Sequence, residues 1–296
     1  MARALSVIER GGAPAREVGR LAFPHGGHAY TVGITGAPGA GKSTLTSALL
    51  GVIRAEGDEV AVLAIDPSSP FTGGAILGDR VRMQDHALDP GVFIRSMATR
   101  GHLGGLALAT PQAVRVLDSG GAPWVLLETV GVGQVEVEVA GAADTTVVVV
   151  NPGWGDAVQA NKAGLLEIAD LFVINKADRP GANDTRRDLE NMLEMTVLPE
   201  GGWRPPILET TASSADGVDL LWSGVADHRS FLERTGLLAA RRARRLSDEL
   251  RTILVRRLEE QATGAASGPT FEELHAEVVA RRLDPYSAAD RLLASL

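Results

Sequence analysis

Short aliphatic runs alternate with segments of helical periodicity along most of the chain. Each run is apolar at nearly every position, which is typical of strands covered on both faces in a parallel sheet. Residues 43–54, between the first two runs, have helical periodicity and are followed by Gly57, so the pattern begins as a β-α-β unit. The strands predicted in this way are Tyr30–Thr35, Glu59–Ile65, Val92–Met97, Trp124–Glu128, Thr145–Asn151, Leu171–Lys176 and Pro206–Thr211.

The two ends of the chain lack these aliphatic runs and have helical patterns instead. We predict one helix before the first strand and several after the last. They are Ala2–Val18, a helix that begins at Val218, and Phe231–Gln261, Phe271–Arg282 and Ala288–Leu296. The predicted parts are therefore a helical extension over 1–29, an α/β domain over 30–228 and a helical region over 229–296.

Composition indicates a soluble globular protein and narrows its chemistry. Hydrophobic residues make up 45% of the 296 residues and charged residues 22%, which is typical of a globular domain. The formal net charge of -8 opposes general electrostatic capture of nucleic acid, so we expect no nucleic-acid partner. The sequence has no cysteine, which excludes disulfides, thiolate metal sites and cysteine nucleophiles. No apolar run reaches the roughly 20 residues of a membrane span, and no signal peptide is evident, so we expect a cytoplasmic protein without a membrane partner.

A glycine-rich loop follows the first predicted strand and precedes the first helix of the α/β domain. It matches the phosphate-binding pattern G-x-x-x-x-G-K-[ST] and lies between a predicted strand and a predicted helix, which is the context that this pattern requires. The alternative is an ordinary glycine turn, which this spacing and context disfavour. Backbone N–H groups of such a loop face the phosphates, while Lys42 reaches the β- and γ-phosphates and Ser43 ligates Mg²⁺. The predicted nucleotide-binding residues of this P-loop are Gly36, Ala37, Pro38, Gly39, Ala40, Gly41, Lys42, Ser43 and Thr44.

A second motif follows the strand at 171–176 and favours guanine as the base. Asn175, Lys176 and Asp178 form an N-K-x-D sequence. A carboxylate at Asp178 can accept both the ring N1–H and the exocyclic amine of guanine, a donor pair that adenine does not present. A plain turn at a strand end is the alternative, and the upstream P-loop disfavours it. At the end of the next strand, Thr211 and Ala212 are predicted to offer a backbone N–H to the guanine carbonyl.

Acidic residues at strand ends are the candidate magnesium ligands. Glu128 ends a predicted strand and precedes a glycine-rich segment, and Asp66 ends another. Together with Asp79 and the hydroxyl of Ser43, these oxygens suit Mg²⁺, which keeps several waters and prefers oxygen ligands. The alternatives are a structural acid at Glu128, where most small GTPases have Asp, and turn or cap roles for Asp66 and Asp79.

These motifs predict hydrolysis of the γ-phosphate by water, with Lys42, Mg²⁺ and backbone amides stabilising the developing charge. Gly131 is placed to donate its N–H to the γ-phosphate, so the predicted catalytic residues are Lys42, Gly131 and Gln134. Gln134 lies three residues beyond Gly131 and is a poor copy of a water-orienting glutamine. We therefore expect slow intrinsic turnover.

Arginines cluster near the start of the long C-terminal helix, at Arg241, Arg242, Arg244 and Arg245. Such a cluster can indicate nucleic-acid binding. A solvated helix face, or a surface for an acidic partner, agrees better with the negative charge of the whole chain.

Several motifs taken together resemble one family of GTPases. They are Gly36–Ser43, Asp66–Pro70, Gly78-Asp79-Arg80, Arg95–Gly101, Glu128–Gln134 and Asn175–Asp178. This combination is similar to the MeaB/ArgK family, the methylmalonyl-CoA mutase-associated GTPases, and the resemblance extends from about Ala4 into the tail at 284–292. Several of these motifs are long and unlike those of other GTPases, although the N-terminal extension is shorter here.

The resemblance implies a homodimeric chaperone that binds an adenosylcobalamin-dependent acyl-CoA mutase, gates cofactor loading with GTP, and protects or reactivates the mutase. It implies that the C-terminal helices form the dimer, and that Lys42, Asp66, Asp79 and Glu128 form the Mg²⁺ and phosphate centre. Residues 155–164 resemble the family's extra switch loop, with Gln159 and Lys162 as switch or partner residues. A solvated surface lysine is the alternative for Lys162.

Other functions stay open at the level of sequence. A metal-insertion GTPase belongs to the same broad class, but such proteins usually present cysteine or histidine ligands, and this chain has no cysteine. An ATP-dependent kinase is opposed by the N-K-x-D motif. A nucleotide-sensing scaffold without turnover has the same motifs and differs only in hydrolysis. The sequence does not identify which acyl-CoA mutase is served.

Overall fold

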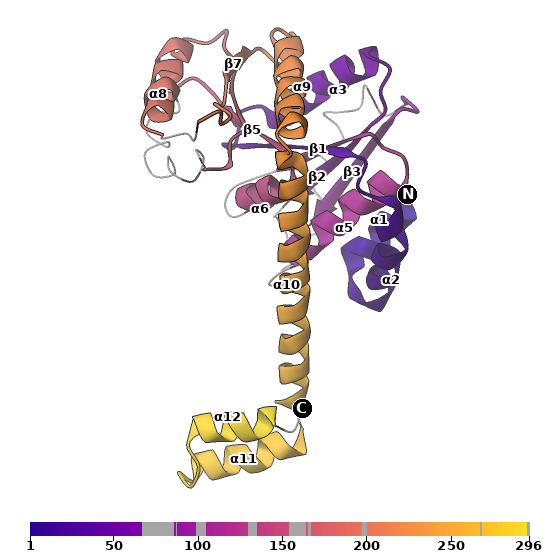
Figure 1. The fold of residues 1–296 in the computed structure, drawn as a ribbon, viewed down its shortest axis with the longest axis vertical. Coiled ribbons are helices and arrows are strands. Elements are labelled where there is room, and N and C mark those ends of the chain that lie inside the picture. The colour runs from indigo at the N-terminus through magenta and orange to yellow at the C-terminus, as the bar shows by residue number, and fades with distance from the viewer. Residues whose placement is uncertain are drawn as a thin grey trace. The chain divides into compact units, whose positions relative to one another are not determined.

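The computed structural model describes residues 1–66, 86, 88–98, 105–129, 135–153, 164, 167–196, 200–266 and 268–294, with the backbone alone described at 66, 98, 105–108, 135–138 and 265. These residues form two compact units, Met1–Ala243 and Arg244–Leu296. The first unit contains a sheet and the helices that cover it (Figure 1). The predicted boundary between residues 228 and 229 lies inside a helix of this first unit.

In the described part of the chain, seven parallel strands form one sheet in the order β3-β2-β4-β1-β5-β6-β7. The strands are β1 Tyr30–Gly36, β2 Val60–Asp66, β3 Val92–Ala98, β4 Trp124–Thr129, β5 Thr145–Val150, β6 Leu171–Asn175 and β7 Ile207–Thr210. The predicted parallel sheet is confirmed, and each strand end lies within one residue of its expected position. Because all strands run in the same direction, their carboxyl ends lie at one edge of the sheet.

The helices differ from prediction where a glycine interrupts an amphipathic pattern. The helices are α1 Ala2–Arg10, α2 Gly12–Ala22, the 3₁₀ helix η1 Phe23–His25, α3 Lys42–Ala55, α5 Gly105–Ser119, α6 Val135–Ala142, α8 Ala182–Glu194, α9 Val218–Arg234, α10 Leu237–Ala265, α11 Pro269–Val279 and α12 Pro285–Leu293. The single helix expected over Ala2–Val18 is two helices, because Gly11 has a φ of 71°. The helix expected over Phe231–Gln261 is likewise broken at Gly236, whose φ is 73°.

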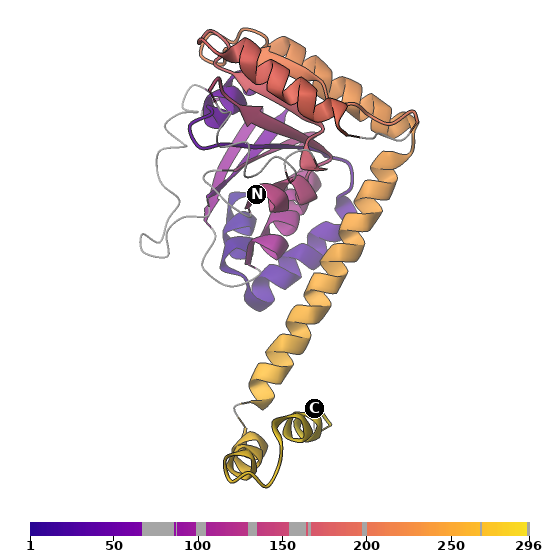
Figure 2. The ribbon, with the colours of Figure 1, turned by 90° about the vertical axis from the view of Figure 1, so that its left-hand side faces the viewer.

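Helices cover both faces of the sheet, as the aliphatic strands predict (Figure 2). On one face α3 and α9 pack on the strands through residues such as Leu49 and Val225. On the other face α1, α5 and α6 contribute Leu5, Leu117 and Val139 to a second cluster, and α8 packs over β5 and β6. The N-terminal helices therefore share the core of the first unit.

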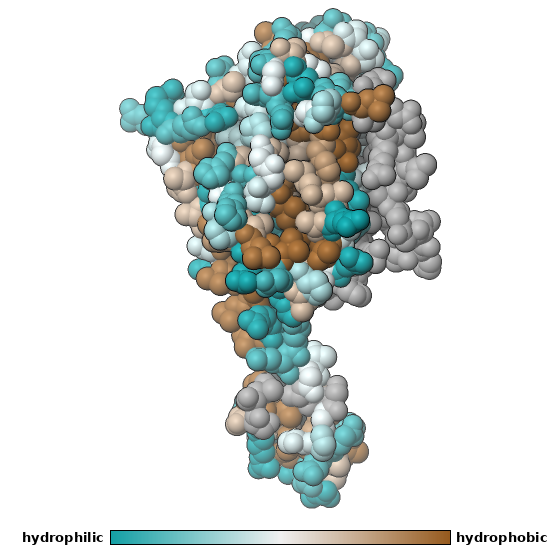
Figure 3. Space-filling view, turned by 90° about the vertical axis from the view of Figure 1, so that its right-hand side faces the viewer, coloured by the Kyte–Doolittle hydropathy of each residue, from teal (hydrophilic) through white to brown (hydrophobic). Residues whose placement is uncertain are grey.

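The surface mixes apolar and polar residues in both units (Figure 3). In the second unit, leucines of α10 such as Leu250 and Leu254 are exposed. Within the described ranges, no helix combines the length and the apolar composition that a bilayer span requires.

The arginine cluster on α10 corrects the sequence interpretation. Arg244 has an 87% exposed side chain, as expected for a solvated helix face. Arg241 and Arg242 are instead paired inside the first unit, with the carboxylates of Asp170 and Asp144. Both acids are buried, and each lies immediately before a strand. Two of the four arginines thus hold α10 on the sheet and present no free surface charge.

Candidate nucleotide-binding site

The P-loop joins β1 to α3 in a conformation that two of its glycines make possible. Gly36 has a φ of 131°, and a Cβ at this position would lie 2.0 Å from the carbonyl oxygen of Val149 on β5. Gly41 has a φ of 92°, and a Cβ there would lie 2.4 Å from the side-chain nitrogen of Asn175. A larger residue at position 36 would have to displace the backbone of β5, and one at position 41 would have to displace the side chain of Asn175. The sheet fixes both ends of the loop.

Lys42 is the first residue of α3, and its side chain is buried against the loop. Its ammonium group donates to the carbonyl oxygens of Gly36 at 2.7 Å and Ala37 at 3.0 Å. The positive charge and the amino-terminal end of α3 therefore lie on the same side of the loop, which is the arrangement that binds phosphate groups.

Ser43 and Glu128 form an oxygen cluster beside the P-loop. The hydroxyl of Ser43 donates to the carboxylate of Glu128 with an O–O distance of 2.5 Å. Glu128 is fully buried near the end of β4, next to Ile34 on β1. A hydroxyl and a buried carboxylate are donors that suit Mg²⁺, so these two residues fit the predicted metal site.

The other predicted ligands are only partly described. Asp66 is the last residue of β2, which pairs with β4 beside Glu128, so its backbone lies at the expected edge of the sheet. Its side chain lies outside the described residues, as do Asp79, Gly131, Gln134, Gln159 and Lys162. Within the described ranges, no group of three or more histidine and acidic side chains is arranged to hold a metal ion.

Asn175 connects the P-loop to the base-recognition strands, a structural role that the motif alone did not reveal. Its amide nitrogen donates to the carbonyl oxygen of Ala40 at 2.8 Å. Its amide oxygen accepts from the hydroxyl of Thr210 at 3.1 Å and from the N–H of Ala212 at 3.1 Å. One buried side chain at the end of β6 thus connects the P-loop to the segment at 210–212.

The remaining base-site residues lie around this amide. The ammonium group of Lys176 donates to the carbonyl oxygen of Gly39 at 2.6 Å, and Lys176 has a φ of 59°. Asp178 is exposed just beyond it. The N–H of Thr211 donates to the carbonyl oxygen of Asp216 at 3.0 Å, and the N–H of Ala212 to Asn175. A guanine carbonyl at this position must therefore share or replace one of these existing hydrogen bonds.

Replacing Asn175 by alanine should destabilise the nucleotide-free protein by about 2–4 kcal/mol, because buried partners at 40, 210 and 212 lose their hydrogen bonds. Urea unfolding monitored by circular dichroism measures this change. Asn183→Ala, at an exposed position of α8, is the matched control and should change stability by less than about 0.5 kcal/mol. Equal stability of the two variants would contradict the structural role of Asn175.

Comparison with known proteins agrees with this geometry. The chain matches the family model described as methylmalonyl Co-A mutase-associated GTPase MeaB over residues 1–267. A protein of Pyrococcus abyssi, provisionally named as a GTPase, is 52% identical over 294 residues, covering 99% of this chain and 91% of the relative. The Escherichia coli GTPase ArgK is 41% identical over 221 residues, covering 73% of this chain and 66% of ArgK. The mouse methylmalonic aciduria type A homolog, mitochondrial, is 34% identical over 268 residues, covering 89% of this chain and 65% of the relative.

Solved structures show the same fold. A structure of an LAO/AO transport system kinase matches with a TM-score of 0.72 and 26% identity, over 99% of this chain and 91% of that chain. HypB from Helicobacter pylori in complex with nickel matches with a TM-score of 0.51 and 16% identity, over 73% of this chain and 94% of that chain, and shares the fold alone. The P-loop geometry and the relatives named as GTPases support GTP hydrolysis. The chain belongs to the family of methylmalonyl-CoA mutase-associated GTPases, MeaB.

Proposed function

We propose that this GTPase is a molecular switch that serves an adenosylcobalamin-dependent acyl-CoA mutase, methylmalonyl-CoA mutase or a close relative. In this role it gates cofactor loading and protects or reactivates the mutase. The match to the mutase-associated family over residues 1–267 carries the proposal. The name of the mouse relative, which refers to methylmalonic aciduria, supports it. We place the protein in the cytoplasm without a nucleic-acid partner, in agreement with its net charge of -8.

The nucleotide centre of the proposal combines the described contacts with the predicted loops. Lys42 reaches the β- and γ-phosphates, and Ser43 and Glu128 hold Mg²⁺ with help from Asp66 and Asp79. The bound cation would neutralise charge on the phosphate oxygens. The ammonium group of Lys42 donates to the carbonyl oxygens of Gly36 and Ala37 in the structure, so binding of the phosphates must exchange these hydrogen bonds for contacts with phosphate oxygens.

The switch function depends on the segments that follow β4 and β5. Gly131 and Gln134 come directly after β4, and Gln159 and Lys162 come shortly after β5. We assign the first pair to sensing the γ-phosphate and the second pair to reporting the nucleotide state to the mutase. Both segments follow strand ends at the edge of the sheet that carries the P-loop. Loss of the γ-phosphate therefore changes contacts at this edge first.

Single-turnover GTP hydrolysis, measured with and without purified acyl-CoA mutase, tests the switch proposal. A client mutase should accelerate hydrolysis at least about tenfold. This factor is smaller than the acceleration produced by proteins that insert a catalytic arginine into a GTPase site. Lys42→Ala should keep the circular dichroism spectrum of the wild type and lose hydrolysis in both conditions. If none of the methylmalonyl-, isobutyryl-, 2-hydroxyisobutyryl- and ethylmalonyl-CoA mutases changes the rate, the chaperone proposal is wrong, although the GTPase assignment stands.

Asp178→Asn should shift the ratio of the affinities for GTP and xanthosine triphosphate at least about 100-fold toward xanthosine triphosphate. The reason is that the amide can donate to the carbonyl that replaces the exocyclic amine of guanine. Competition binding against a fluorescent guanine nucleotide measures the change. Asp184→Asn, which alters an exposed acid of α8, should leave base preference unchanged. An unaltered preference in Asp178→Asn would show that guanine is read by another residue.

We also propose that the second unit forms a homodimer with another copy of the chain. Leucines recur at every fourth position of α10, at 246, 250, 254 and 258, and each is at least 47% exposed. This spacing aligns them along one side of a helix. Such a row of leucines on a helix rich in charged residues can pack against the same row on a second copy of the chain. A symmetric pair of helices then buries the leucines of both copies.

Leu254→Glu should raise the dimer dissociation constant at least about 100-fold, because two leucines leave the interface and each contributes about 1.5–3 kcal/mol when buried. Analytical ultracentrifugation over a concentration series measures the constant. Thr252→Glu introduces the same side chain on the opposite side of α10 and should have little effect. Dimerisation that is equally strong in both variants would place the interface elsewhere.

A further inference from the structure

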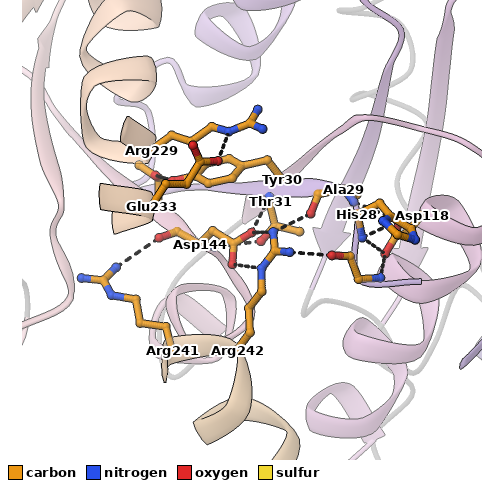
Figure 4. A network of polar contacts seen from close by, with 12 residues as sticks. His28, Ala29, Tyr30, Thr31, Asp118, Asp144, Arg229, Glu233, Arg241 and Arg242 are labelled. Atoms are coloured by element: carbon orange, nitrogen blue, oxygen red, sulfur yellow. Dashed lines mark hydrogen bonds and ion pairs between the residues drawn. The ribbon is translucent and has the colours of Figure 1, made fainter. Parts of the chain in front are cut away.

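At the edge of the sheet away from the P-loop, Arg242 of α10 joins two strands and a linker (Figure 4). The carboxylate of Asp144, only 1% exposed, accepts the N–H of Thr31 on β1 at 3.1 Å and directly precedes β5. Arg242 pairs with this carboxylate at 2.7 Å. Its guanidinium also donates to the carbonyl oxygens of Gly27 at 2.7 Å and Ala29 at 2.8 Å, in the linker before β1. One side chain of α10 therefore binds the beginnings of β1 and β5.

Arg241 makes the corresponding contact with β6. Asp170 precedes β6, and its carboxylate accepts the N–H of Thr146 on β5 at 2.9 Å. Arg241 binds this carboxylate through both terminal nitrogens, at 3.0 Å and 2.9 Å. It also donates to the carbonyl oxygen of Asp144 at 3.1 Å. Two consecutive arginines thus bind the acids that begin two neighbouring strands.

A buried hydrogen-bonded chain adds α9 to the same cluster. The hydroxyl of Tyr30 on β1 lies 2.7 Å from the hydroxyl of Thr145 on β5, which lies 2.8 Å from Nδ1 of His228 on α9. His228 is fully buried, and this burial lowers its pKa to about 4, so the ring is neutral at physiological pH. Its Nε2 lies 3.2 Å from the Asp170 carboxylate. The ends of β1, β5 and β6 are consequently linked to α9 and α10.

Two of the three strands that meet this cluster end at predicted nucleotide-binding residues, and the third precedes the predicted switch segment. β1 ends at Gly36 of the P-loop, β6 ends at Asn175, and β5 lies between them and leads toward 154–163. All three strands are buried along their whole length. Close-packed interiors transmit strain, so we expect a displacement at the nucleotide end of a buried strand to reach its other end.

We propose that Arg241 and Arg242 couple the nucleotide site to α10, so that bound nucleotide strengthens the docking of residues 237–243 on the sheet. The proposal depends on GTP binding and does not depend on the identity of the client protein. Gly236 separates the two helices, since α9 ends at Arg234 and α10 begins at Leu237. Release of residues 237–243 would separate two buried carboxylates from their guanidinium partners, which is strongly unfavourable, so these pairs oppose partial release.

Hydrogen exchange of the backbone amides of 237–243 tests the coupling. In the wild type, a non-hydrolysable GTP analogue with Mg²⁺ should slow this exchange at least about fivefold relative to the nucleotide-free protein. Arg242→Met should remove the slowing. By reciprocity it should also weaken binding of the analogue by the same factor, although Arg242 lies at the opposite edge of the sheet. Arg244→Met makes the same change at an 87% exposed side chain and should behave like the wild type.

A second variant keeps the test decisive if Arg242→Met fails to fold because the buried carboxylate of Asp144 loses the Arg242 guanidinium. Arg242→Met combined with Asp144→Asn removes both charges, while the amide oxygen can still accept the N–H of Thr31. This double variant should show the same loss of slowing and of affinity. Equal exchange in the two wild-type states overturns the proposal. Slowing that persists in the variants, or slowing lost with affinity unchanged, overturns it as well.

Discussion

The side-chain amide of Asn175 is the interaction on which the nucleotide site depends. It binds the P-loop at Ala40 and the predicted base-recognition segment at Ala212, so it connects both to β6. The same amide explains a glycine, since a Cβ at Gly41 would lie 2.4 Å from its nitrogen. The shape of the phosphate loop is thus set by a residue that follows it by more than a hundred positions. A loop held in this way keeps its N–H groups oriented before any phosphate arrives.

At their amino-terminal ends, the strands need hydrogen-bond acceptors, and this requirement leads to the arginine contacts. The first N–H groups of parallel strands need acceptors at the edge of the sheet, and Asp144 and Asp170 supply them to Thr31 and Thr146. Buried carboxylates in turn need counter-charges. Arg241 and Arg242 provide these, and a helix outside the sheet is consequently bound to it. Buried ion pairs of this kind contribute little net stability compared with apolar packing, but removal of one partner is strongly destabilising.

The strands were predictable because short unbroken aliphatic runs that alternate with helical patterns are typical of a buried parallel sheet, and every strand end lies within one residue of its predicted position. The breaks at Gly11 and Gly236 were not predictable from periodicity, because apolar residues continue at helical spacing across each glycine. The P-loop and Glu128 were identifiable because glycines and an acid interrupt apolar sequence at strand ends. The pairing of Arg241 and Arg242 was hidden, since a charged helix face looks the same in sequence whether water or a buried acid meets it.

The contact between Ser43 and Glu128 defines how the hydroxyl of Ser43 is oriented beside the P-loop. The hydroxyl of Ser43 has one proton, which it donates to Glu128, and two lone pairs. Donation to a buried carboxylate therefore leaves the oxygen of Ser43 able to ligate a cation. It also fixes the rotation of the hydroxyl, because the only proton is engaged. The acid near the end of β4 thus orients the predicted metal ligand at the start of α3, and this contribution is the same whether the carboxylate would bind the cation directly or through a water of its hydration shell.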